Sequence, residues 1–194
     1  MATASLPYPA LSFDVDYRDG PRNRLSVGLR PIFAIPALIV LAALQASVLA
    51  LPVALMLLFR QRYPAWWFEW NRNYLRYSNR VVSYLFLLRD EYPATEEDQA
   101  VHLYLENPRD AGELNRWMPI VKWFLAIPHY IVLAFLWVGV VLTSIAAWFA
   151  ILFTGRHPRA LFDYVVGVLR WTNRVTAYAF VLNTDQYPPF RLSS

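Results

Sequence analysis

The feature of this chain that most constrains its fold is an uncharged apolar stretch that occurs twice. Pro31–Phe59 contains no Asp, Glu, Lys, Arg or His, and Trp123–Gly155 contains only His129 of these residue types. An apolar run of about 18 residues already qualifies as a candidate membrane span. Hydrophobic residues make up 57% of the chain, above the usage of soluble domains. The sequence therefore predicts an integral membrane protein.

The two stretches belong to an internal repeat. Ala34–Ala42 matches Ala126–Ala134 at seven of nine positions. Further matches pair Asn79-Arg80-Val81 with Asn173-Arg174-Val175, Tyr84 with Tyr178, and Tyr92-Pro93 with Tyr187-Pro188. Such self-similarity indicates duplicated units that pack against each other. We predict two membrane repeats, residues 1–93 and 94–194.

Each unit is predicted to begin with a short strand outside the hydrocarbon, because apolar and polar residues alternate in Leu11–Tyr17 and in Val101–Glu106. The apolar stretch that follows exceeds the roughly 20 residues of one membrane-spanning helix but is too short for two full spans and a turn. Two alternatives stay open. The stretch forms either one long, kinked helix or a short helical hairpin that enters the membrane and returns.

The placement of arginine favours the hairpin. If each unit crossed the membrane once, the segments Arg60–Arg80 and Arg156–Arg174 would face opposite sides. That conflicts with the tendency of Lys and Arg near span ends to stay cytoplasmic. Hairpins place both segments on one side. We therefore predict a multi-pass protein whose arginine-rich segments are cytoplasmic.

An amphipathic helix is predicted after each apolar stretch, at Leu161–Leu182 in the second unit. Asp163, Arg170 and Arg174 fall on one helical stripe, and aliphatic and aromatic residues fill the rest. Such a helix suits a membrane interface. The predicted fold is thus mainly α and integral membrane. Each of its two tandem repeats has a short extramembrane strand, an apolar helical hairpin or long kinked helix, and an amphipathic interfacial helix.

Several segments of the second unit resemble a known family. They are Ala126–Leu133, Trp148–Pro158, Leu161–Tyr164, Gly167–Trp171, Arg174–Tyr178 and Gln186–Phe190. These segments closely resemble a bacterial membrane family known as domain of unknown function 4389. The resemblance is close over residues 100–192 and weaker over residues 8–93, where Arg60-Gln61 replaces Thr154-Gly155. It implies a bacterial inner-membrane protein and carries no established activity, ligand or catalytic residue.

Arginines are the most specific candidates for ligand binding. Arg76 and Arg80, like Arg170 and Arg174, are four residues apart and share a helix face. The candidate lipid- or anion-binding residues are Arg62, Arg76, Arg80, Arg156, Arg170 and Arg174. The planar guanidinium suits phosphate groups. The competing interpretation is a solvated stripe that is attracted to any anionic membrane surface.

No catalytic or metal site is expected. The chain has no cysteine, and His102 and His157 lack metal-ligand spacing with His129. Paired carboxylates in the apolar stretches, a glycine-rich phosphate loop and a serine nucleophile elbow are all absent from the sequence. We interpret His129 as a satisfied interfacial histidine rather than a proton relay. No cofactor is expected.

These observations favour a small non-enzymatic integral membrane protein that acts as a scaffold or accessory subunit of a membrane assembly. Its expected partners are membrane lipids and either further copies of itself or another membrane protein. Nucleic acid is not expected, because the net charge is only +4 and no basic block lies outside the membrane-proximal segments. The alternative is a lipid or small-solute binding or transport protein with its site where the repeats meet.

Overall fold

The computed structural model describes residues 11–45, 65–107, 115 and 117–193. This part of the chain is mainly α, with one two-stranded sheet. The helices are α1 (Arg24–Gly28), α2 (Arg30–Phe33), α3 (Ile35–Gln45), α5 (Ala65–Leu85), α6 (Met118–Leu125), α7 (Ile127–Thr154), α8 (Arg159–Thr176) and the π-helical turn η1 (Ala177–Val181). The strands are β1 (Leu11–Val15) and β2 (Val101–Leu105).

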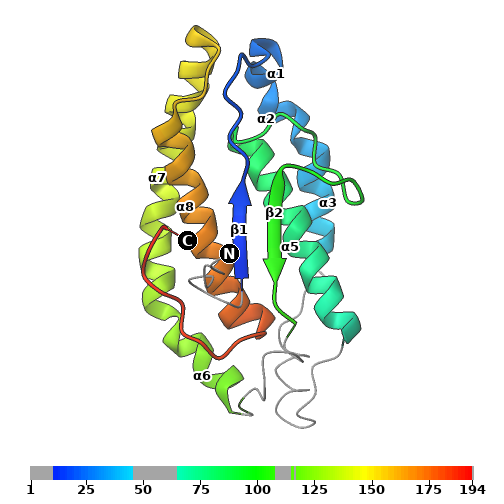
Figure 1. Cartoon of the computed structure of the whole chain (residues 1–194), viewed down its shortest axis with the longest axis vertical. Coiled ribbons are helices and arrows are strands. Elements are labelled where there is room, and N and C mark those ends of the chain that lie inside the picture. The colour runs from blue at the N-terminus through cyan, green and yellow to red at the C-terminus, as the bar shows by residue number, and fades with distance from the viewer. Residues whose placement is uncertain (1–10, 46–64, 108–114, 116, 194) are drawn as a thin grey trace, which may run out of the picture.

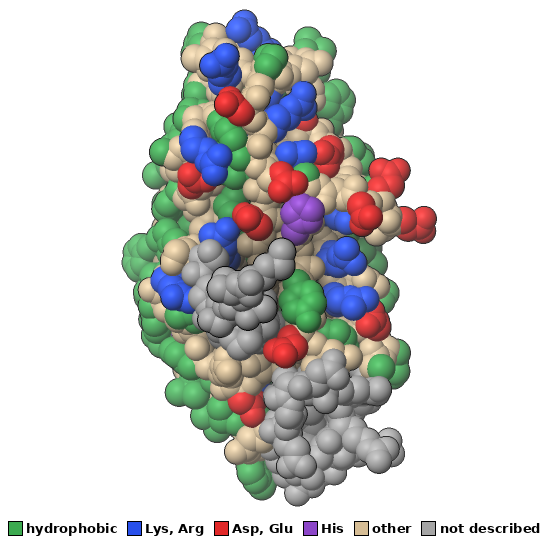
Figure 2. Space-filling view, in the orientation of Figure 1, with side chains coloured by type: hydrophobic (Ala, Val, Ile, Leu, Met, Phe, Trp, Pro, Cys, Tyr) green, Lys and Arg blue, Asp and Glu red, His purple; other side chains and the backbone are tan. Residues whose placement is uncertain are grey.

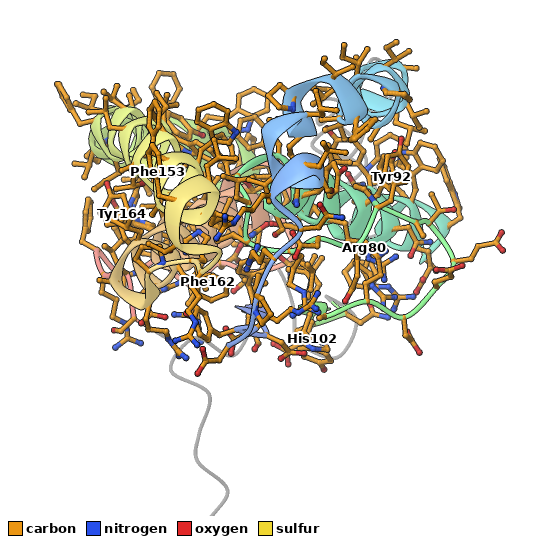
Figure 3. All side chains as sticks on the ribbon, turned by 90° about the horizontal axis from the view of Figure 1, so that it is seen from above. Arg80, Tyr92, His102, Phe153, Phe162 and Tyr164 are labelled. Carbon is orange, nitrogen blue, oxygen red and sulfur yellow. The ribbon has the colours of Figure 1, made fainter. Side chains whose placement is uncertain are left out.

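The elements form three layers (Figure 1, Figure 3). The sheet lies on one side, α5 and α8 lie in the middle, and α3 and α7 lie on the opposite side. Within the outer helical layer α3 and α7 run in opposite directions, as α5 and α8 do within the middle layer. The middle helices are therefore covered by the sheet on one side and by the outer helices on the other.

The sheet links the two predicted units. Its strands are antiparallel, with Phe13 opposite Leu103 at the centre. β1 comes from the first unit and packs on α8 of the second, whereas β2 comes from the second unit and packs on α5 of the first. Both strands predicted from the alternating pattern are confirmed. Leu11, Phe13 and Val15 point inward and are buried, which explains the alternation.

The helix predicted at Leu161–Leu182 is present as α8 and η1, but its predicted place at a membrane interface is wrong. α8 packs on α7 on one side and on β1 on the other. Val165, Val168 and Leu169 are almost completely buried. The charged stripe, which suggested a face toward lipid headgroups, is partly covered by the sheet instead, because the Arg170 guanidinium donates to the backbone oxygen of Phe13.

The hairpin prediction is wrong for the second unit. α7 is one uninterrupted helix of 28 residues, and Gly139, near the middle of the apolar stretch, lies in its interior where a hairpin would have to turn. The long, kinked helix is the alternative observed, since the chain breaks at Ala126, between α6 and α7. In the first unit, the structure describes α3 over Ile35–Gln45. The rest of that predicted hairpin lies outside the described residues.

α7 packs closely on α8 at Gly139. A Cβ atom at Gly139 would lie 2.3 Å from the Tyr164 hydroxyl oxygen. That hydroxyl donates to the backbone oxygen of Leu136 at 3.0 Å. The glycine therefore serves close approach of the two helices rather than a turn.

Candidate functional site

Among the described residues, one face of the protein exposes only uncharged side chains. We call it the apolar face and define it as the exposed residues of α2, α3, α6 and α7. Its most exposed members on α3 and α7 are Ile39 (63%), Ile131 (57%), Phe135 (75%), Val138 (60%), Leu142 (63%) and Phe153 (77%). Viewed from above, these two helices form one edge of the molecule, far from the sheet (Figure 3).

The charged residues and histidine of these four helices all point inward. They are Arg30, Lys122 and His129, and each is at most 1% exposed. Burying an ionisable group is costly unless it is paired. The inward placement leaves the apolar face free of charge, and each buried group therefore needs a specific internal partner. Among the described helices, α7 is the one that is long and apolar enough to cross a membrane.

The opposite face, which contains the sheet, is charged. Positively charged arginine side chains and negatively charged acidic side chains are interspersed across it (Figure 2). Several are paired across elements: Arg170 with Asp14 at 3.1 Å and His102 with Asp16 at 3.1 Å. Such exposed pairs contribute little to stability. They do make the protein amphipathic as a whole.

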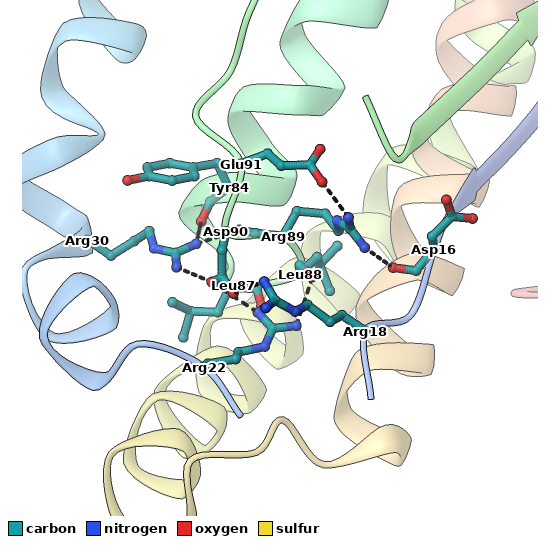
Figure 4. A network of polar contacts seen from close by, with 10 residues as sticks. All are labelled: Asp16, Arg18, Arg22, Arg30, Tyr84, Leu87, Leu88, Arg89, Asp90 and Glu91. Atoms are coloured by element: carbon teal, nitrogen blue, oxygen red, sulfur yellow. Dashed lines mark hydrogen bonds and ion pairs between the residues drawn. The ribbon is translucent and has the colours of Figure 1, made fainter. Parts of the chain in front are cut away.

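Arg30 is held at the junction of α2 with the end of α5 (Figure 4). Its guanidinium forms an ion pair with Asp90 and donates to the backbone oxygen of Tyr84 at 3.2 Å and to that of Arg89. The guanidinium carbon also lies 4.4 Å from the centroid of the Tyr84 ring, in cation–π geometry. This buried arginine fastens the start of the apolar stretch to the end of α5.

Arg22 strengthens the same junction. It donates to the backbone oxygens of Leu87 at 2.6 Å and Leu88 at 3.0 Å, and it lies 3.5 Å from Asp90. Burial lowers the pKa of Arg22, an effect that Asp90 opposes. Leu87 itself has a left-handed backbone (φ 64°), so the arginines hold a strained chain reversal in place.

The second unit contains a matching arrangement built on lysine. The Lys122 ammonium lies 2.6 Å from Asp185, donates to the backbone oxygen of Thr184 at 2.7 Å, and sits 5.3 Å from the Tyr178 ring centroid. Leu182 provides the left-handed reversal here (φ 60°). We call the two arrangements the Arg30 clamp (Arg30, Tyr84, Asp90) and the Lys122 clamp (Lys122, Tyr178, Asp185).

Sequence reasoning missed both clamps, although a signal was present. Arg30 and Lys122 each stand four residues before an alanine that the repeat pairs, Ala34 and Ala126. Tyr84 and Tyr178 are also paired by the repeat. A cation at matching places just before two apolar stretches indicates a shared internal partner.

His129 is buried within this scaffold. Its Nδ1 accepts a hydrogen bond from the Trp171 indole at 3.0 Å, and its ring stacks on Phe190 with centroids 3.9 Å apart. The residue at the matching place in the first unit is Ala37, whose backbone oxygen lies 3.5 Å from the Tyr77 hydroxyl. His129 is thus fully enclosed and hydrogen-bonded, not interfacial.

His157 lies outside α7, in the connection to α8. It is 3% exposed, its Nδ1 lies 3.0 Å from the backbone oxygen of Pro158, and its own backbone oxygen accepts from the Tyr17 hydroxyl at 2.7 Å. Burial lowers the pKa of His157 to about 4. The side chain is therefore neutral at physiological pH.

The predicted binding arginines do not form one cluster. Arg76 and Arg80 line a hollow of about 450 Å³ beside β2, together with His102 and Asp98. Arg170 lines a separate hollow of about 650 Å³ beside β1, together with Asp14, Asp16, Arg159 and Asp163. Each hollow contains at least one carboxylate, which offsets part of its positive charge.

The remaining predicted arginines have different surroundings. Arg174 is buried and donates to the backbone oxygen of Ser193 at 2.6 Å. Arg156 is exposed in the loop after α7. Arg62 lies outside the described residues. Within the described part of the chain, no group of three His, Cys, Asp or Glu side chains is arranged to hold a metal ion.

Comparison with known proteins gives one finding. A family described as Domain of unknown function (DUF4389) matches the chain twice, at residues 24–95 and at residues 116–191. No curated protein and no solved structure matches the chain.

Proposed function

The chain belongs to the DUF4389 family as two tandem copies, and from this membership and the geometry above we propose that it is a non-enzymatic membrane protein that acts as a scaffold or accessory subunit. The observation that carries the proposal is the apolar face. Four helices expose apolar side chains there and turn Arg30, Lys122 and His129 inward. A contiguous apolar surface of this kind marks contact with a membrane or a protein.

We propose that the apolar face lies in the plane of the membrane, with α3 and α7 along the surface of the hydrocarbon. An amphipathic surface of this type embeds about 5–10 Å into one leaflet. The sheet would then face water. Because α3 and α7 lie in one layer on the side opposite the sheet, both copies present their charged sides to the same aqueous compartment.

The charges argue against α7 as a span. Trp137, near the middle of α7, donates to Thr172 of α8 at 3.2 Å, and Thr172 is two residues from Arg170. A spanning α7 would therefore carry the Arg170–Asp14 pair at the depth of the bilayer centre, where each charge costs about 3 kcal/mol or more. In-plane embedding avoids this cost, and it keeps the predicted arginine-rich segments on one side without the predicted multi-pass topology.

The predicted bacterial inner membrane remains our proposed location, with the charged side toward the cytoplasm in accordance with the positive-inside tendency. The scaffold role is supported by the exposed residues of the charged side, which contains the sheet. Its exposed Tyr104 (59%) on β2 shares a hollow with Arg76, Arg80 and Asp98, a composition that suits a polar, specific protein contact. The partner is either a second copy of the chain or another membrane protein.

The membrane assignment is tested by vesicle flotation. Phe135→Glu combined with Leu142→Glu adds two carboxylates to the apolar face, and Tyr104→Glu adds one to the sheet face as a matched control. Wild type and control should float with vesicles of phosphatidylglycerol and phosphatidylcholine, whereas the double variant should remain at the bottom of the gradient. Circular dichroism checks that all three are folded. Equal flotation of the double variant would refute the assignment.

The scaffold role is tested by photo-crosslinking in native membranes. A photoreactive side chain at position 104 should yield a discrete protein adduct, and the same group at position 142 should react with lipid. Mass spectrometry of the adduct distinguishes a second copy from another protein. Absence of any protein adduct from position 104 and its neighbours on β2 counts against a scaffold.

The second candidate function is binding of an anionic lipid or small solute. It is supported by Arg76 and Arg80, which share one hollow with His102. Asp98 in the same hollow weakens its attraction for anions, which is why we place this function second. Arg76→Ala with Arg80→Ala should then reduce retention of a co-purified anionic lipid, measured by mass spectrometry.

A further inference from the structure

The strand β2 has an open outer edge, on the side away from β1. The backbone N–H of Asp16 donates to the carbonyl of Ala100 at 3.0 Å, and hydrogen-bonded pairs alternate along an antiparallel ladder. Because Phe13 lies opposite Leu103, the backbone N–H and C=O groups of Leu103 point outward. Within the described part of the chain these two groups make no hydrogen bond. An unpaired strand edge is a template for another extended chain.

The outer edge of β1, by contrast, is covered by the chain itself. Arg170 of α8 donates from its Nε to the backbone oxygen of Phe13 at 3.0 Å. Its guanidinium also forms an ion pair with Asp14 at 3.1 Å and donates to the backbone oxygen of Leu192 at 3.4 Å. One carbonyl and one carboxylate of the same strand thus satisfy this arginine.

The first copy has the same arginine without the carboxylate. The repeat pairs Arg76 of α5 with Arg170, and β2 packs on α5 as β1 packs on α8 (Figure 1). The residue after the central position of the strand is Asp14 on β1 but Tyr104 on β2. Among the described residues, Arg76 forms neither an ion pair nor a hydrogen bond. The edge of β2 therefore leaves both its backbone groups and its arginine without partners.

A hollow of about 450 Å³ brings these groups together, since Leu103, Arg76 and Arg80 all line it. Arg80 is only 5% exposed and donates to the backbone oxygen of Ala94 at 2.6 Å, so the partly exposed Arg76 is the cation that an entering group can reach. Asp98 in the same hollow offsets part of the positive charge. A free anion would meet only this weakened charge, whereas an extended acidic segment would also pair with the open edge.

We propose that the outer edge of β2 binds an extended acidic segment of the partner protein as an added β-strand. The backbone of that segment pairs with the N–H and C=O groups of Leu103, and one of its carboxylates pairs with Arg76, as Asp14 pairs with Arg170 in the other copy. Strand addition to an open sheet edge is a recurrent mode of peptide recognition. The inference rests on the proposed scaffold role and specifies the chemistry of the partner.

The test uses a synthetic peptide of about seven alternating threonine and valine residues with one glutamate at its centre, titrated into the full chain in detergent. Wild type should bind it, and glutamine in place of the glutamate should weaken binding about five-fold, the upper value for a partly exposed ion pair. Arg76→Ala should bind both peptides equally, because the charge partner is gone. Arg72→Ala, one turn away and paired with Glu69, is the matched control and should keep the preference for glutamate. No binding by wild type, or an unchanged preference in Arg76→Ala, overturns the proposal.

Hydrogen exchange at single backbone amides tests the added strand. The Leu103 amide should exchange rapidly in the free chain and about ten-fold more slowly or less with the glutamate peptide bound, because it gains a hydrogen bond. The Tyr104 amide, which the ladder pairs with β1, is the internal control and should be protected in both states. A peptide N-methylated at alternate residues cannot form the ladder and should leave the Leu103 amide unprotected. A Leu103 amide that is already protected in the free chain, or unchanged by the peptide, rejects the added strand.

Crosslinking from position 104 separates failure of this inference from failure of the scaffold role. A protein adduct in native membranes, without peptide binding or protection of Leu103, removes strand addition and leaves the scaffold role standing. Absence of both the adduct and peptide binding removes both. Short-chain phosphatidylglycerol that binds in an Arg76-dependent manner, where the peptide does not bind, would make the hollow a lipid site and overturn the proposal.

Discussion

Asn79 and Asn173 exchange two side-chain hydrogen bonds, of 2.8 and 2.7 Å, where α5 meets α8. Each side-chain amide also donates to a carbonyl of its own helix, that of Leu75 or Leu169. The repeat pairs these two asparagines with each other. The corresponding asparagine of each copy therefore makes this contact between the copies. A substitution of one asparagine removes hydrogen bonds of the other.

Asn79→Ala is expected to lower the free energy of unfolding by about 1–3 kcal/mol, because it leaves the buried Asn173 amide without its partner. Chemical denaturation of the purified chain measures the loss. Asn73→Ala, at an exposed place on the same helix, is the matched control and should change stability by less than about 0.5 kcal/mol. Equal effects of the two substitutions would contradict the paired role.

The clamps predict that cations are exchangeable between the copies. Arg30→Lys should retain much of the stability, because Lys122 performs the same task in the second copy with an ammonium group. Arg30→Met should cost about 3 kcal/mol or more, since Asp90 and the carbonyls of Tyr84 and Arg89 lose a buried partner. Thermal unfolding of the three proteins ranks them. Equal stability of the Lys and Met variants would show that the clamp is not electrostatic.

His157 predicts a loss of stability in mild acid. Its pKa is about 4 in the folded protein, against 6.5 as the ordinary value. The unfolded chain therefore binds the proton more tightly, and stability falls as the pH drops from about 6.5 to 4, by up to about 3 kcal/mol. His157→Asn should flatten this part of the pH profile of unfolding. His102→Gln, on the exposed sheet, should leave it in place.

Gly139→Ala should loosen α7 from α8. The new methyl would lie 2.3 Å from the Tyr164 hydroxyl oxygen, and overpacking of this kind costs about 1–3 kcal/mol. Tyr164→Phe removes that oxygen and should restore part of the stability of Gly139→Ala in the double variant. A double variant no more stable than Gly139→Ala alone would place the strain elsewhere.

Local sequence patterns predicted much of the secondary structure. The alternation at Leu11–Tyr17 and Val101–Glu106 predicted both strands, and the resemblance to two copies of one family agrees with the two family matches. What failed was the placement of elements. Arginines on Leu161–Leu182 suggested a lipid-facing stripe, because nothing in one helix reveals that a strand of the other copy covers it.

The hairpin failed for a similar reason. Charge bias gives the side of a membrane but not the path of the chain, and in-plane helices satisfy the same bias. The clamps were missed because Arg30 and Lys122 look like ordinary flanking cations. Their partners Asp90 and Asp185 lie about 60 residues further on, beyond any local pattern.

The most direct test of the central claim is the depth of α7 in a bilayer. Because the chain has no cysteine, single cysteines at Ile131, Phe135, Leu142 and Phe153 can carry a spin label, and its collision rates with oxygen and a water-soluble relaxing agent report depth. We predict one similar, shallow depth at all four positions. A depth that is greatest at Phe135 and Leu142 and falls toward both ends would show that α7 crosses the membrane and would contradict the account.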